Sequence, residues 1–395
     1  MPRRLFGISR LLPVAVALLC AACAEKPPVH AEEQPQSAPT AATPKLLFPV
    51  APNREADDLA RFLAGLPARE GSSFEELHKT PEWEAHAQQS DRMWEAFETK
   101  RVPALRDFSQ EELDRFHTSD PTVFYPFGGP DSLMATLFFP KHSNYILVGL
   151  EPPGSLIPAK RFKPEELAEK LGQIRGTLDS LLARSFFITR QMDKELRGQI
   201  ADGLLLPIMV QLVRQGDTIR GLQYAAVDAD AKLALKPDPW DAKTKNRGVL
   251  LEFEDSDHAL HQLAYFSVNL DDDHLAKNPQ FFQWLNAAGP SVTFFKSTSY
   301  MIHQKPFSRI REQVLEHSVA VLQDDSGIPY HFFTEKDWNV QLYGEFDKPY
   351  GSFRYLVQPD LKKAYQEGAN VKKLNFRIGY GFGKVPSNLQ LATPR

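Results

Sequence analysis

The segment from residue 248 to residue 269 reads GVLLEFEDSDHALHQLAYFSVN. Val249, Leu251 and Phe253 alternate with other residues along its first half. Ala264, Phe266 and Val268 alternate in the same way along its second half. This two-residue period on both sides of a polar turn predicts two neighbouring strands of an antiparallel hairpin. Further strands are expected at residues 144–150, 219–227, 328–333, 339–346 and 373–380.

Helical patterns occur in blocks between these strands. Thr80 followed by Pro81 predicts the N-cap and the first residue of a helix. The spacing of leucine and isoleucine predicts amphipathic helices over 164–184, over a segment that stops at Gly216, and over 309–322. Because helices and hairpins do not alternate regularly, we expect an α+β fold. An N-terminal helical segment would pack on a mainly antiparallel sheet with flanking helices.

The N-terminus has the pattern of a bacterial targeting signal. Basic residues precede an apolar run over 11–19, which is too short for a membrane span. Ala21-Ala22-Cys23 resembles the bacterial lipobox, which implies that Cys23 is acylated, although Cys20 stands where that motif has leucine. Ordinary cleavage by the general secretion route, giving a soluble secreted protein, remains the alternative. A partial match to the twin-arginine signal also stays open.

Composition divides the chain into five expected parts. We expect a signal peptide over 1–22, a disordered tether rich in Pro, Ala and Glu over 23–48, a helical part over 49–120, an α+β body over 121–385 and a tail over 386–395.

Charge and cysteine content exclude several functions. The chain has 46 Lys and Arg against 50 Asp and Glu, a net charge of −4, so we expect no nucleic-acid partner. Both cysteines lie in the signal region, which excludes a cysteine nucleophile, a thiolate zinc site and a disulfide from the body. The acidic and histidine residues over 255–261 and 271–274 match no metal-ligand spacing. We expect no metal site there and no cofactor.

Two loops contain groups suited to binding or catalysis. After a strand-like run, Gly128-Gly129-Pro130 leads to Asp131, the expected N-cap of a helix. This arrangement is typical of a turn, although backbone amides at such a place also bind anions. A stretch of hydroxyl residues with one lysine, over 296–300, is a weak nucleophile candidate because no recognised catalytic motif surrounds it.

The second loop contains adjacent carboxylates. Asp324 and Asp325 follow the helix expected over 309–322, and His317 lies on its apolar face. Together with His303, these residues are the candidate catalytic groups for acid–base chemistry. A solvated loop beside a core histidine is the preferred interpretation, since structural conflicts of this kind are commoner than catalytic ones.

Three segments, Tyr125–Asp131, Leu150-Glu151-Pro152 and Leu322–Tyr330, resemble an uncharacterised family of secreted bacterial proteins. The resemblance implies that the three segments converge in space. It implies nothing about chemistry. Separately, we take Tyr125, Asp131, Glu151 and Tyr330, which lie in these segments, as candidate ligand-binding residues.

These features predict an envelope lipoprotein that binds an envelope protein or a glycan and is attached to the membrane through Cys23. It would face the periplasm, with the outer membrane favoured over the inner. The alternative is a periplasmic hydrolase or metal-dependent enzyme that uses the Asp/His cluster. A structural spacer without a sizeable pocket is the third hypothesis.

Overall fold

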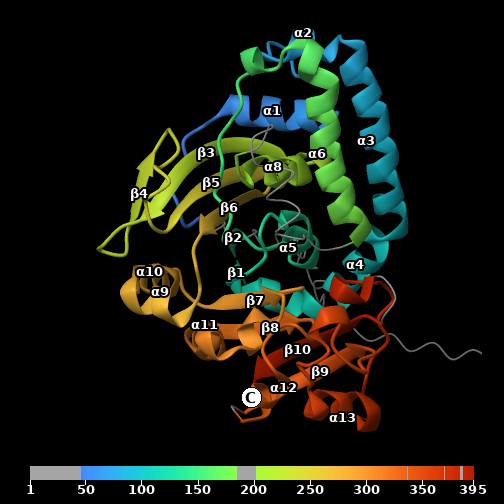
Figure 1. Cartoon of the computed structure of the whole chain (residues 1–395), viewed down its shortest axis with the longest axis vertical. Coiled ribbons are helices and arrows are strands. Elements are labelled where there is room, and N and C mark those ends of the chain that lie inside the picture. The colour runs from blue at the N-terminus through green and yellow to red at the C-terminus, as the bar shows by residue number, and fades with distance from the viewer. Residues whose placement is uncertain (1–45, 185–201, 336, 369, 383–385) are drawn as a thin grey trace, which may run out of the picture. The chain divides into compact units, whose positions relative to one another are not determined.

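The computed structural model describes residues 46–395 except 185–201, 336, 369 and 383–385 (Figure 1). The described residues belong to one compact unit. None of the helices in this part of the chain is long and apolar enough to cross a membrane. The expected signal peptide, Cys23 and all but the last residues of the expected tether lie outside the described residues.

A mixed sheet with ten described strands forms the centre of the unit. The strands are β1 (Thr122–Tyr125), β2 (Asn144–Gly149), β3 (Thr218–Val227), β4 (Leu233–Lys236), β5 (Arg247–Glu254), β6 (Leu260–Ser267), β7 (Ser291–Phe295), β8 (Ser318–Gln323), β9 (Trp338–Gly344) and β10 (Asn388–Pro394). Their order is β4-β3-β5-β6-β2-β1-β7-β8-β10-β9. Five of the nine strand pairings are antiparallel, including the predicted hairpin β5–β6, which confirms the α+β prediction.

The five central strands are all parallel, in the order β6-β2-β1-β7-β8. From β1 the chain proceeds outward to β2 and later to β6, and then continues on the other side of β1 with β7 and β8. The direction of strand addition therefore reverses between β1 and β7. In open parallel sheets, ligands bind outside the carboxyl ends of the strands at such a topological switch point.

Helices cover both faces of this sheet (Figure 1). One apolar core involves α1 (Arg54–Ala64), α3 (Pro81–Lys100), α4 (Val102–Phe108), α5 (Ser132–Phe138), α6 (Pro164–Arg184) and α8 (Leu205–Arg214). The other involves α9 (Asp272–Lys277), α10 (Gln280–Ala287), α11 (Ser308–His317) and α12 (Tyr330–Glu335). The short α2 (Glu75–His78) precedes α3, and α13 (Pro359–Glu367) packs near β9. In β1, Val123 and Tyr125 belong to the first core and Phe124 to the second.

Several sequence predictions are confirmed by the local structure. The Thr80 hydroxyl accepts a hydrogen bond from the Trp83 amide, and Pro81 is the first residue of α3. The Asp131 carboxylate accepts one from Met134 at the start of α5. The helix predicted over 164–184 is α6, with the predicted bounds.

Other predictions are wrong, and for residues 318–323 the reason is burial on both faces. The helix expected over 309–322 ends at His317, and residues 318–323 are strand β8. A short apolar run buried on both faces has no two-residue period, so its sequence does not distinguish a strand from a helix. The strand expected over 328–333 overlaps α12, and none of residues 373–380 lies in a strand.

The first described residues are fixed to the amino ends of β2 and β6. Gln262 is completely buried, and its side-chain oxygen accepts hydrogen bonds from the amides of Leu47 and Phe48, both at 2.9 Å. Its side-chain nitrogen donates to the Phe48 carbonyl oxygen at 2.8 Å. The Phe48 ring stacks on Trp284 of α10. The chain therefore enters the folded unit at the amino edge of the parallel strands.

Candidate functional site

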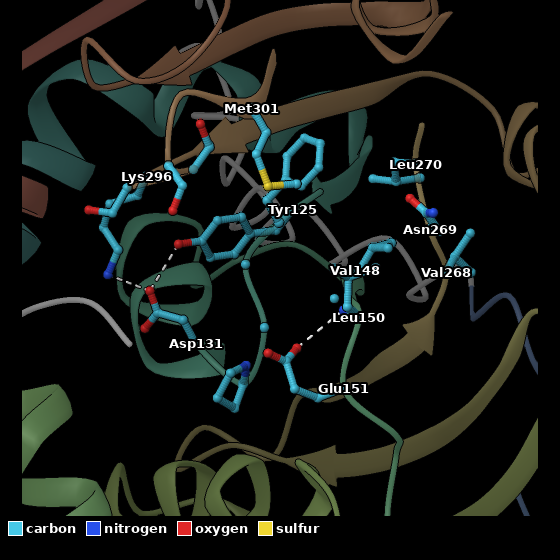
Figure 2. Close-up of a pocket in the computed structure, with 18 residues that line it drawn as sticks. Tyr125, Asp131, Val148, Leu150, Glu151, Val268, Asn269, Leu270, Lys296 and Met301 are labelled. Atoms are coloured by element: carbon cyan, nitrogen blue, oxygen red, sulfur yellow. Dashed lines mark hydrogen bonds and ion pairs between the residues drawn. The ribbon is translucent and has the colours of Figure 1, made fainter. Parts of the chain in front are cut away.

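A pocket lies at the carboxyl ends of the central strands, at the switch point (Figure 2). We call it the switch-point pocket, and it is lined by residues 125 and 127–131 after β1, 148–151 after β2, 268–270 after β6, and 296–299 and 301 after β7. Its cavity volume is about 100 Å³, and the space including its open mouth is about 800 Å³. A ligand of nucleoside size would therefore lie partly inside the cavity and partly in the mouth.

The loop after β1 forms one wall of the pocket, and its shape requires glycine. A Cβ atom on Gly128 would lie 2.7 Å from the Tyr125 ring, and Gly129 has a φ of +56°. Phe127, which is not glycine, also has a positive φ of 61°. Such backbone strain concentrates at functional sites. The loop therefore approaches the pocket more closely than residues with larger side chains would permit.

A buried ion pair forms part of the pocket lining beside this loop. The Lys296 ammonium contacts an Asp131 carboxylate oxygen at 2.5 Å, and the Tyr125 hydroxyl donates to the same oxygen at 2.9 Å. Figure 2 shows Asp131 between these two partners. Burial lowers the pKa of Lys296 and raises that of Tyr125, while Asp131 favours the charged lysine. The pair neutralises its own charges and connects the loop after β1 to the end of β7.

Glu151 contributes a carboxylate from the end of β2. The hydroxyls of Ser267 and Tyr265 donate to the carbonyl oxygens of Leu150 and Glu151, at 3.1 and 2.8 Å, and so fix this end of the strand. The Oε2 atom of Glu151 accepts from the Leu150 amide at 3.2 Å (Figure 2). Among the described residues, none donates a hydrogen bond to Oε1. This oxygen is therefore available to a ligand.

Two glycines allow the Glu151 carboxylate to reach the loop after β1. A Cβ on Gly149 would lie 2.9 Å from Oε2 of Glu151 and 3.3 Å from the Cα atom of Gly129. The carboxylate and the glycine loop are thus neighbours across the pocket floor. Leu150, at the rim, is 56% exposed although it is a large apolar residue. A flat apolar group in the mouth of the pocket would cover it.

The loop after β7 forms the opposite wall. Ser297, Ser299 and Tyr300 all have positive φ angles, between 52° and 55°. Their strained conformation is held by hydrogen bonds from two backbone amides: Ser297 donates to the Asp324 carboxylate at 2.9 Å, and Ser299 donates to the Tyr380 hydroxyl at 3.0 Å. The wall is therefore fixed by side chains that are distant in sequence.

Asp324 and Asp325 support this wall and are buried, at 2% and 7% exposure. The expectation of a solvated loop is wrong, because the pair follows strand β8 instead of a helix. Asp325 accepts a hydrogen bond from Asn388 at 2.8 Å and another from the Tyr300 hydroxyl. Burial is the main cause that raises the pKa of both carboxyls, and Asp325 reaches about 7.

The other candidate residues do not form a single cluster with these two carboxylates. His303 lies beside the backbone of Asp325 and Gly327, and burial lowers the pKa of its imidazole to about 4. His317 is exposed at the end of α11, and the length of β8 separates it from Asp324. Tyr330 begins α12, where its amide donates to Gln358 at 3.2 Å, and it does not line the pocket.

The three segments compared with the secreted family come to the same edge of the sheet. Tyr125, Asp131 and Glu151 line the pocket, whereas the segment 322–330 lies behind its far wall through Asp324. Sequence reasoning missed the apolar wall formed by Val268 and Leu270. Nor did it use the position of Glu151, just after β2 and about twenty residues after a glycine loop.

Metal binding has no geometric support in the part of the chain that the structure describes. No group of three or more His, Cys, Asp or Glu side chains there is placed to hold a metal ion. Asp255 and His261 do meet, at 3.1 Å. This contact lies at the opposite edge of the sheet, at the amino ends of the parallel strands.

Comparison of the chain with protein-family models, curated proteins and solved structures gives no match. The inference of function therefore depends on the residues of the pocket.

Proposed function

We propose that the protein binds a nucleoside without phosphate groups in the switch-point pocket. The observation that carries this proposal is Glu151, whose carboxylate lies just after the end of β2 and beside the glycine loop. One of its oxygens accepts no hydrogen bond from the described residues. A carboxylate at this place in a parallel sheet can accept hydrogen bonds from the vicinal hydroxyls of a ribose. The apolar wall of Val148, Val268 and Leu270, with Leu150 at the rim, suits a flat base.

The same residues disfavour a phosphate. Asp131 caps the helix that follows the glycine loop, and Pro130 has no amide hydrogen. The ammonium of Lys296 is already paired with Asp131. Glu151 adds a negative charge, which repels anions and attracts cations. The favoured ligand is therefore neutral or carries a positive substituent, as an adenosine bearing a sulfonium or amine does.

Isothermal titration of the purified protein tests this proposal. The probes are adenosine, 2′-deoxyadenosine, S-adenosylmethionine, S-adenosylhomocysteine, AMP and NAD. We expect the phosphate-free ribonucleosides to bind. 2′-Deoxyadenosine and AMP should bind at least about tenfold more weakly, which corresponds to roughly 1.4 kcal/mol.

Glu151→Gln should lower adenosine affinity toward that of 2′-deoxyadenosine, because the amide is a poorer acceptor for the two hydroxyls. Glu165→Gln, on the exposed side of α6, is the matched control and should bind like the wild type. Equal affinity for the ribo- and deoxyribonucleoside, unchanged by Glu151→Gln, would overturn the proposal. Absence of binding to every probe would also overturn it.

We also propose that the protein acts at the bacterial envelope, attached through a lipid on Cys23 and facing the periplasm. Support comes from the basic residues, the apolar run and Ala21-Ala22-Cys23. Cys23→Ala should abolish labelling by a fatty-acid probe and release the protein from membranes. Membrane retention of the variant would contradict the anchor. An envelope protein or a glycan stays the proposed macromolecular partner.

The hydrolase alternative requires the Asp/His cluster to act together. His317 lies at the far end of β8 from Asp324, and the carboxylates of Asp324 and Asp325 are occupied by hydrogen bonds within the protein. This geometry favours ligand binding in the switch-point pocket over acid–base catalysis by the Asp/His cluster.

A further inference from the structure

A second hollow lies at the opposite edge of the sheet, where the parallel strands begin. We call it the amino-end pocket; Lys141, Tyr145, Asp217, Phe253, Asp255 and His261 are among its lining residues. Its cavity volume is about 510 Å³, which is within the range of small-molecule sites. It shares no lining residue with the switch-point pocket.

Asp217 is the unusual group in this pocket. The residue is only 8% exposed, it lines the cavity, and its carboxylate has no hydrogen-bond or ion-pair partner among the described residues. A buried carboxylate in this state is costly unless a donor or a cation meets it. Accordingly, burial and the nearby Asp255 raise the pKa of Asp217 to about 7.

The surrounding charges leave Asp217 uncompensated. Lys141 is paired with Asp114, which also accepts from His117. His261 uses Nδ1 on the His142 carbonyl oxygen at 2.8 Å and Nε2 on Asp255 at 3.1 Å. Asp257 and Arg106 are exposed at the rim. Among the described residues that line the cavity, Asp217 is therefore a buried carboxylate that neither a cation nor a hydrogen-bond donor meets.

We propose that the amino-end pocket binds a small organic cation, an amine or a guanidinium, through Asp217. The rings of Tyr145 and Phe253, 6.3 Å apart, line the same cavity and offer faces or edges to the carbon chain of such a ligand. A metal ion fits less well, because no three metal-ligating side chains converge in the described part of the chain. This site is independent of the nucleoside site.

Titration of the full-length protein with putrescine and agmatine tests the proposal, with 1,4-butanediol as the uncharged analogue of putrescine. At pH 8 we expect saturable binding of the two cations and none of the diol. Asp217→Asn should weaken cation binding by at least about tenfold, because it removes the charge and keeps the shape of the side chain. Asp257→Asn removes an exposed carboxylate at the rim and should change affinity by less than about threefold.

Lowering the pH from 8 to 6 should weaken binding about tenfold in the wild type, because Asp217 becomes protonated over this range. Asp217→Asn should show little of this dependence. Equal binding of putrescine and butanediol, an unchanged affinity in Asp217→Asn, or no binding of either cation at millimolar concentration would overturn the proposal. Adenosine affinity should be the same in both variants, which separates this test from that of the switch-point pocket.

Discussion

The buried carboxylates at the two ends of the parallel strands differ in whether a cation is paired with them. At the carboxyl ends, Lys296 and Asp131 are paired within the lining of the switch-point pocket. At the amino ends, Asp217 lies in the amino-end pocket, and none of the residues that the structure describes pairs with its carboxylate. The first arrangement fixes the shape of a site before any ligand arrives. In the second arrangement, the buried charge destabilises the folded protein until a cation binds to it or a proton neutralises it.

Burial alone therefore does not show whether a carboxylate stabilises or destabilises the folded protein. Asp131 and Asp217 are both nearly inaccessible, at 2% and 8% exposure. Their partners decide the consequence: one carboxylate contributes to the stability of the native state, and the other opposes it at neutral pH. Substitutions at the two positions should therefore change stability in opposite directions.

Asp131→Ala should have the largest effect. It leaves the buried Lys296 ammonium without its partner and removes the cap of α5. We expect the free energy of unfolding to fall by about 3–5 kcal/mol, measured by urea denaturation. Asp131→Asn, which retains an acceptor for the cap, should lose less. If Asp131→Ala were nearly as stable as the wild type, the paired and the unpaired carboxylate would not differ as we infer, because the ion pair would then not stabilise the native state.

Asp324→Ala should have the second-largest effect on stability. Its carboxylate accepts from the amides of Ser297 and Ser326, so its removal leaves buried donors unsatisfied. We expect a loss of about 2–4 kcal/mol in the free energy of unfolding. Adenosine affinity should also fall, because the wall after β7 relaxes. Asp257→Ala, which removes an exposed carboxylate at the rim of the amino-end pocket, is a control away from this wall. An unchanged affinity would show that this wall does not shape the site.

Asp217→Asn should instead stabilise the protein at pH 8, by about 1–3 kcal/mol. The pKa of Asp217 is raised in the folded state, so the native protein holds a proton that the unfolded chain releases between about pH 4 and pH 7. The stability that this group contributes at low pH is therefore lost as the pH rises through that window. Denaturation at pH 5 and pH 8 measures it, and the variant should differ from the wild type mainly at pH 8. Destabilisation at pH 8 would mean that Asp217 has a partner.

Tyr380→Phe should have the smallest effect. The ring stacks between Tyr300 and Tyr350, and its hydroxyl accepts from the Ser299 amide. The hydroxyl also donates to the Ser297 carbonyl oxygen at 3.1 Å. The substitution keeps the stack and removes these hydrogen bonds, so we expect the free energy of unfolding in urea to fall by about 1 kcal/mol. A loss several times larger would show that this hydroxyl, more than Asp324, holds the strained loop.

Local patterns in the sequence predicted the parts of the fold that depend on neighbouring residues. The β5–β6 hairpin, the Thr80 and Asp131 caps and the bounds of α6 follow from side chains within a few positions of one another. The parallel strands β7 and β8 were missed because both of their faces are buried and their sequences have no alternation. The α+β class was predicted, but the doubly wound order at its centre was not.

The residues of the candidate site show the same difference between local patterns and contacts that are distant in sequence. Tyr125, Asp131 and Glu151 were named from segments that end strands, and they line one pocket. The burial of Asp325 depends on Asn388, 63 residues further along the chain. No local pattern records such a contact, so the sequence indicated a solvated loop where the protein has a buried support.

The attachment of Phe48 to Gln262 has a mechanical consequence. Any pull on the chain through residue 46 is first resisted at the amino edge of β2 and β6, by three hydrogen bonds to one buried amide. The switch-point pocket lies at the other end of these strands, about 20 Å away. If the preceding residues lead to a membrane, traction from that membrane loads the amino edge of β2 and β6, and the switch-point pocket lies at the opposite ends of these strands.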